Sequence, residues 1–195
     1  MMKKRYLLSL CMAVLLAVEL QAKVILPALL CDNMVIQQNS VACLWGKSDA
    51  SVLTVKPSWT EKEYRTDISG NGSFQLWIET PSAGGPFEIE FDDGEKTTVR
   101  NVMVGEVWIC AGQSNMDMPM SGYPGQPVNG ALEAVVEAKE YPVHVFMVNR
   151  KLSKQTEEQC DGKWEAPSAE SVMHSSATAY FFAKNLQKSL QVPVG

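Results

Sequence analysis

The segment Val107–Met120, VWICAGQSNMDMPM, decides how we expect the second half of the chain to fold. It continues an apolar run, Val102–Cys110, which predicts a buried strand that stops at Ala111 and Gly112. Ser114 would then lie at the carboxyl end of this strand, where open α/β sheets keep their active sites. Gly112 allows the backbone to turn sharply beside it. A serine in that place is a candidate nucleophile if a base reaches its hydroxyl.

A second interpretation of Ser114 remains open. Serine is a preferred N-cap residue, so its hydroxyl can simply close the first turn of the next helix. Gly-x-Ser triplets are common, and a motif this short is a hypothesis until its structural context is known. We expect the neighbouring residues Gln113 and Asn115 to hold the turn by hydrogen bonds.

The amino terminus has the layout of a secretory signal peptide, which we assign to residues 1–22. Basic residues at positions 3–5 precede an apolar run, Tyr6–Val18, and Gln21-Ala22 ends the segment with a small residue. The run is too short to span a bilayer, which takes about 20 residues. We therefore expect a periplasmic or secreted protein without stable membrane insertion after cleavage. A lipoprotein modified at Cys11 is less favoured, because the bulky Leu10 precedes it.

Charge and cysteine usage exclude several classes of function. The chain of 195 residues has a net charge of −5, whereas nucleic-acid binding requires a basic face. Four cysteines follow the leader, at positions 31, 43, 110 and 160, and export permits disulfides. Cys31 and Cys43 can pair, while Cys110 is expected to be a buried thiol. Their spacing is not that of a zinc site, and Met116, Met118 and Met120 are more typical of packing than of copper ligation.

Residues 23–98 predict a β-sandwich-like domain. Short strand-like runs recur about every ten residues between turn signals, as in all-β sandwiches. These runs are Met34–Ile36, Ala42–Trp45, Val52–Val55, Phe74–Ile78, Phe87–Phe91 and Thr97–Val99. Two roles are open for Trp45, Trp59 and Trp77: a sugar-binding platform, or packing, which is the commoner.

Residues 99–195 change to an α/β pattern. After the strand before Ser114, we expect a helix from about 128 to 139, a strand over Val143–Val148 and a helix from about 176 to 190. Gln191–Gly195 begins a further strand. This alternation predicts the first part of an α/β domain. Because the pattern stops at a strand that has barely begun, we expect the chain to be an incomplete fragment of a longer protein.

Several motifs resemble the sialate O-acetylesterase family of carbohydrate esterases, whose catalytic domain has the SGNH-hydrolase, flavodoxin-like fold. Gly112–Met116, GQSNM, is similar to the first conserved block of SGNH-type esterases. Further segments that resemble this family are Asp32–Gln38, Leu44–Gly46, Gly105–Trp108, Lys163-Trp164 and Ser175–Ala183. The resemblance covers nearly all of the chain after the leader.

The resemblance implies an exported serine esterase that removes O-acetyl groups from sialic acid or other acetylated glycans through an acyl-serine intermediate, without metal or cofactor. It implies that Ser114 is the nucleophile and that its backbone N–H helps to bind the oxyanion, with Gly112, Gln113 and Asn115 in support. The family's catalytic histidine and aspartate lie late in its sequences, so we expect both beyond Gly195. Asp117 does not match that aspartate.

Two alternatives remain open. His144 and His174 are the only histidines in the chain, and positions such as theirs are more typical of structural or exposed residues than of a catalytic base. The chain can also be a catalytically inactive fragment whose β module binds carbohydrate or another protein.

Overall fold

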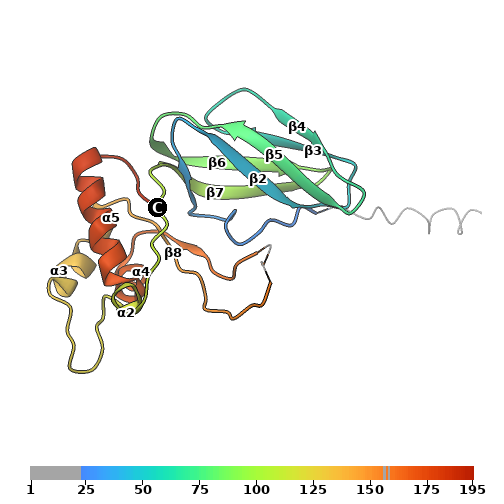
Figure 1. Cartoon of the computed structure of the whole chain (residues 1–195). Helices are drawn as coiled ribbons and strands as arrows, with labels where there is room; N and C mark the ends of the chain where they lie inside the picture. The colour runs from blue at the N-terminus through green and yellow to red at the C-terminus, as the bar shows by residue number, and fades with distance from the viewer. Residues whose placement is uncertain (1–22, 156, 158) are drawn as a thin grey trace, which may run out of the picture.

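The computed structural model describes residues 23–155, 157 and 159–195; the expected signal peptide lies outside them. A region of strands comes first and a region of short helices follows. Figure 1 shows the two regions side by side, with the carboxyl terminus between them. None of the described helices has the length and apolar character that crossing a bilayer demands.

Two sheets build the β-rich region, and the fold is mostly sheet. The larger sheet has the strand order β1-β7-β6-β3-β4, and the smaller pairs β2 with β5. β1 runs parallel to β7, and the other neighbours are antiparallel. The strands are β1 (Val35–Gln37), β2 (Val41–Lys47), β3 (Val52–Pro57), β4 (Tyr64–Asp67), β5 (Ser73–Glu79), β6 (Gly84–Asp92) and β7 (Lys96–Gly105).

The core of this region follows from strand alternation, which turns successive side chains to opposite faces. On β5, Phe74 and Ile78 are buried, whereas Gln75 and Trp77 are exposed. Other strands contribute core residues with no exposed surface: Leu44, Leu53, Val55, Ile89, Phe91, Val102 and Val104. Trp45 and Trp59 pack against this core, as the commoner role predicts, but Trp77 is 57% exposed.

The prediction of one buried strand over Val102–Cys110 is wrong in its second half. β7 ends at Gly105, and the residues from Val107 to Gln113 form no regular element and are exposed, Ile109 to 95%. The apolar run alone could not show this, because burial depends on neighbours that the sequence does not name. β7 also crosses residue 98, so the first sheet continues past the position where we expected the first domain to end.

The helical region consists of short elements and one longer helix. They are α2 (Ser114–Asp117), α3 (Ala131–Val136), the 3-10 turn η1 (Ala138–Glu140), β8 (Val145–Phe146), β9 (Trp164–Glu165), α4 (Ala169–His174) and α5 (Ala177–Leu190). α5 confirms the helix expected over 176–190. The helix expected from 128 is shorter, because Gly130 has a φ of 78° and α3 begins only after it.

Val194 brings distant segments together by parallel pairing. It bridges Glu106 on one side and Val143 on the other. The Gly195 amide donates to the Glu106 carbonyl at 2.8 Å, and the His144 amide donates to the Val194 carbonyl at 2.9 Å. Parallel pairing of these segments is what the α/β pattern predicts, although each bridge involves a single residue pair. A complete α/β domain stays a prediction.

The cysteines differ from expectation. Cys31, Cys43, Cys110 and Cys160 are all free thiols in the structure, so no bridge joins Cys31 to Cys43. Cys110 is exposed rather than buried, because it lies in the segment that leaves the sheet after Gly105.

Candidate functional site around Ser114

Ser114 is the first residue of α2, and Gln113 occupies the N-cap position. No side-chain hydrogen bond caps this helix. The interpretation of Ser114 as a helix cap is therefore wrong. Its side chain is exposed and lines a surface cleft with a volume of about 460 Å³.

The cleft combines polar and apolar side chains from three segments. α2 and the residue after it contribute Ser114, Asn115 and Met118; the loop that follows contributes Tyr123, Gln126 and Val128; the first turns of α5 contribute Ala177, Thr178 and Phe181. Serine, amide and threonine groups can bind hydroxyl-rich ligands, while the apolar side chains can contact a methyl group. A small polar ligand with an apolar substituent therefore fits this lining.

The start of α5 fixes the position of α2. The Ala177 amide donates to the Met118 carbonyl at 2.9 Å, and the Thr178 hydroxyl donates to the Asn115 carbonyl at 3.0 Å. Within α2, the Asp117 amide donates to the Gln113 carbonyl at 3.0 Å. Gln113 and Asn115 contribute to this turn through backbone carbonyl oxygens, which any residue would offer, so a role for their side chains stays a prediction.

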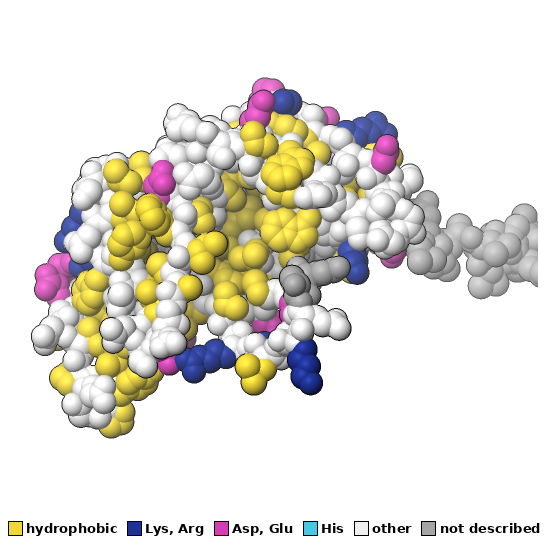
Figure 2. Space-filling model, viewed as in Figure 1, with side chains coloured by type: hydrophobic (Ala, Val, Ile, Leu, Met, Phe, Trp, Pro, Cys, Tyr) yellow, Lys and Arg dark blue, Asp and Glu magenta, His cyan; other side chains and the backbone are white. Residues whose placement is uncertain are grey.

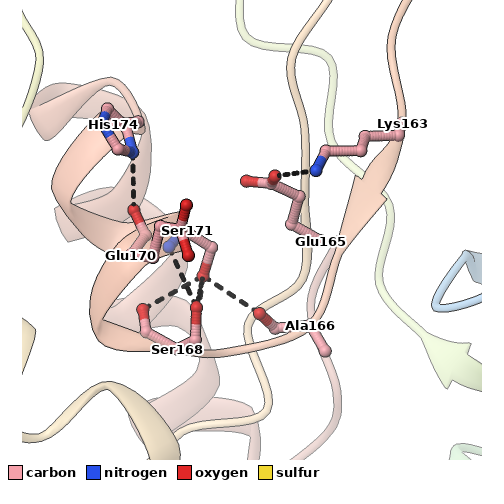
Figure 3. A network of polar contacts seen from close by, with 7 residues as sticks. All are labelled: Lys163, Glu165, Ala166, Ser168, Glu170, Ser171 and His174. Atoms are coloured by element: carbon pink, nitrogen blue, oxygen red, sulfur yellow. Dashed lines mark hydrogen bonds and ion pairs between the residues drawn. The ribbon is translucent and has the colours of Figure 1, made fainter.

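α4 precedes α5 and begins with a capping box, drawn in Figure 3. The Ser171 amide donates to the Ser168 hydroxyl, and the Ser168 amide donates to the Ser171 hydroxyl, each at 3.0 Å. The Ser171 hydroxyl also donates to the Ala166 carbonyl at 3.0 Å. These bonds satisfy amides that a helix leaves free at its start and fix where α4 begins.

Gly112 lies where a side chain would be crowded by Met116. A Cβ at this position would lie 3.1 Å from the Cβ of Met116, which is tighter than ordinary van der Waals contact. The Met116 sulfur in turn accepts a hydrogen bond from the Ser176 hydroxyl at 3.4 Å. The glycine therefore lets the chain pass closely over α2, rather than supplying a left-handed turn.

Asp117 is already engaged at the edge of the cleft. Its carboxylate forms an ion pair with Arg150. The Tyr123 hydroxyl donates to the Asp117 carbonyl at 3.1 Å. The hydrogen bond that Arg150 donates to the Asp117 carboxylate raises the pKa of Arg150 and so favours its charged form. This engagement agrees with leaving Asp117 out of the catalytic set.

Neither histidine is placed as a base for Ser114. His144 is buried, and its Nδ1 donates to the Asn33 carbonyl at 2.6 Å; burial lowers the pKa of His144. His174 is exposed, with Nδ1 at 3.0 Å from the Glu170 carbonyl of its own helix (Figure 3). Among the described residues, no hydrogen bond joins either ring to Ser114.

Metal chemistry has no candidate ligand set in the part of the chain that the structure describes. No three or more His, Cys, Asp or Glu side chains gather there in a way that could hold an ion. Met120 is fully buried in the core of the helical region, so it packs as expected.

Sequence reasoning found Ser114 but missed most of its surroundings. Thr178 and Phe181 lie within the run Ser175–Ala183, which carries part of the family resemblance, although nothing local shows that they face the cleft. No sequence pattern indicates that Tyr123 and Arg150 lie near Ser114. Their positions depend on contacts with Asp117 of α2 from residues that lie outside that helix.

Comparison with known proteins gives the following matches. The rat sialate O-acetylesterase is 30% identical over 184 residues, which are 84% of this chain and 33% of that protein. The human sialate O-acetylesterase is 28% identical over 183 residues. A crystal structure of a carbohydrate acetylesterase from Xanthomonas citri superposes with a TM-score of 0.81 at 30% identity, covering 89% of this chain and 39% of that one. No family model matches.

The chain spans about a third of the length of the curated relatives it matches. The match nevertheless extends over most of the chain itself. The sequence match is to a sialate O-acetylesterase, and the structural match is to a carbohydrate acetylesterase. The chain is therefore a homologue of the sialate O-acetylesterases, and the resemblance predicted from the motif at Gly112–Met116 and its companion segments is confirmed.

Proposed function

We propose that the protein is an exported serine esterase that removes O-acetyl groups from sialic acid or other acetylated glycans, with Ser114 as the nucleophile. The observation that carries this proposal is the position of Ser114. It is exposed at the start of α2, inside a cleft, in a chain homologous to sialate O-acetylesterases. The leader at residues 1–22 supports export to the periplasm or the medium.

The reaction follows the usual two-step course of serine esterases. The Ser114 oxygen attacks the acetyl carbonyl while a base takes its proton. The tetrahedral oxyanion collapses, the sugar hydroxyl leaves with that proton, and an acetyl-serine remains. Water then attacks the acyl group with the same base, which releases acetate and restores the hydroxyl.

This chain supplies the nucleophile and part of the oxyanion site. The Ser114 amide is one of the first N–H groups of α2, which have no partner within a helix. It can donate to the oxyanion, where such donors are worth about 2.7–4 kcal/mol each. We propose that the base and its aspartate come from chain beyond Gly195, within an SGNH-type α/β domain. The absence of a suitably bonded histidine among the described residues supports this division.

The lining of the cleft supports an acetylated sugar as the ligand. Asn115, Gln126 and Thr178 offer hydrogen-bonding groups that suit sugar hydroxyls. Val128 and Phe181 offer an apolar surface that suits the acetyl methyl group. Acetate release from acetylated glycans is therefore the activity to measure.

Replacement of the nucleophile tests the proposal. In the product of the complete reading frame, Ser114→Ala should lower acetate release from an O-acetylated sialic acid and from p-nitrophenyl acetate by at least about a thousandfold, because no acyl-enzyme can form. Ser121→Ala, an exposed serine in the loop after α2, is the matched control and should keep wild-type activity. Circular dichroism should show the same fold for all three proteins.

Two results would contradict the proposal. Retention of most activity by Ser114→Ala would exclude this serine as the nucleophile. Absence of acetate release from every acetylated substrate by the complete protein would favour the alternative, a non-catalytic module that binds carbohydrate or protein. The 195-residue chain alone should show negligible turnover; strong Ser114-dependent activity there would mean that His144 or His174 acts as the base.

A further inference from the structure

The edge of the Ser114 cleft holds a cation that ester hydrolysis does not use. Arg150 pairs with Asp117, which lies three residues after Ser114 on the same short helix. The Tyr123 hydroxyl, which belongs to the cleft lining, bonds to the carbonyl and, at 3.4 Å, to the carboxylate of Asp117. The guanidinium is therefore one side chain away from the cleft wall.

Among the described residues, the ion pair with Asp117 leaves Arg150 with donors for a ligand. A guanidinium has five N–H groups. In the ion pair with Asp117, Arg150 uses Nη2 to contact one carboxylate oxygen. Its side chain is 79% exposed, so the remaining donors face solvent. Lys151, the next residue, pairs with Glu157 at 3.5 Å and has no described contact with Asp117. Arg150 is thus a cation next to Asp117 with donors left for an anion.

We propose that Arg150 is a substrate-recognition residue that binds the carboxylate of an acetylated sugar acid while the O-acetyl group reaches Ser114. The proposal rests on the esterase function above and narrows its substrate from acetylated glycans to those that carry a carboxylate. The planar guanidinium fork matches a carboxylate in a bidentate geometry, which neither lysine nor a neutral sugar reproduces.

Asp117 has a defined part in this arrangement. Its carboxylate anchors the guanidinium against α2, and so reduces the side-chain freedom that binding would otherwise have to remove. It also offsets part of the positive charge, so the attraction for a second carboxylate is local and depends on hydrogen-bond geometry. The preference for an acidic over a neutral substrate should therefore depend on close contact between Arg150 and the carboxylate. It should be lost when that carboxylate is esterified.

A matched pair of substrates tests this directly. The complete protein is assayed for acetate release from an O-acetylated sialic acid and from its methyl ester, which keeps the acetyl group but has no negative charge. Wild-type kcat/KM should be roughly 10- to 100-fold higher for the acid, the range expected for a charge-assisted hydrogen bond. The difference should lie mainly in KM.

Variants assign the effect to one residue. Arg150→Met should lower kcat/KM for the acid to the level of the methyl ester, while leaving the rates with the methyl ester and p-nitrophenyl acetate unchanged. Arg150→Lys should restore only part of the preference. Lys151→Met is the neighbouring control and should keep the wild-type preference.

Two results would overturn carboxylate recognition by Arg150. One is an equal loss of activity by Arg150→Met toward acid and methyl ester, which would show a general structural role. The other is an unchanged preference for the acid in Arg150→Met. Failure of the esterase proposal is seen separately, as activity retained by Ser114→Ala.

Discussion

The β-rich and helical regions bury their apolar side chains to different extents. In the first, β2 and β5 pair in unbroken register from Val41–Glu79 to Lys47–Ser73, and core residues such as Phe91 have no exposed surface. In the second, parallel contacts are single bridges at Val194, and many large apolar side chains are exposed. Figure 2 shows apolar side chains gathered in the recess between the two regions.

This difference shows where the stability of the described chain resides. Burial of apolar surface contributes roughly 25 cal/mol per Å², so the fully buried β core contributes most of it. The helical region holds the cleft and has a smaller core of its own, which includes Tyr180 and Val194. Trp164 belongs to the second region in sequence, yet it packs in the β core and donates from Nε1 to the Leu29 carbonyl at 3.0 Å.

The largest expected effect is the loss of a central core residue. Phe91→Ala should lower the free energy of unfolding by about 3–5 kcal/mol, because it removes a fully buried ring and leaves a cavity. Urea denaturation followed by circular dichroism measures this loss. Trp77→Ala, an exposed aromatic of the same region, is the control and should cost far less. Equal losses for the two variants would refute the view that the β core carries the stability.

A smaller and more local effect is expected at the junction of the two regions. In Gly105→Ala the new Cβ would overlap the Pro193 carbonyl oxygen, a backbone atom that cannot move aside cheaply. Overpacking of this kind costs typically 1–3 kcal/mol. Amide hydrogen exchange should then accelerate at Trp108 and Gly195, which are bonded across this junction, while β5 stays protected.

Gly70→Ala is the control for this change, because no atom of the described residues lies within 4 Å of its added Cβ. It should leave hydrogen exchange in both regions unchanged. Uniform acceleration in Gly105→Ala, across β5 as well as the junction, would contradict the local effect that we expect.

The sequence predicted the β region well because strand alternation is local. Six of its strands lie at or near the expected runs, as with Phe74–Ile78 inside β5. β4 was missed because Tyr64–Asp67 reads Tyr-Arg-Thr-Asp, with only Tyr64 buried. An edge strand of this kind has no apolar run to reveal it.

The helical region and the site were less predictable because their contacts are not local. Ser114 was found through its motif, and the structure places it in a cleft. The exposure of Ile109 and the meeting of Arg150 with Asp117 depend on segments far apart in the chain. A pattern in one segment does not specify which other segment covers it.

The smallest change in stability is expected at His144, which links the two regions through its bond to the Asn33 carbonyl. Burial lowers the pKa of His144 below its ordinary value of 6.5, so at acidic pH the unfolded chain binds a proton that the native state resists. The free energy of unfolding should therefore fall as the pH drops below 6.5, through the folded-state pKa.

His144→Gln keeps a donor for Asn33 but removes this dependence, so its stability should change less between pH 7 and about pH 5. His174→Gln, at an exposed position, is the control and should show the same pH dependence as the wild type. If the free energy of unfolding of His144→Gln falls with pH as steeply as that of the wild type, His144 is not the acid-sensitive contact between the two regions.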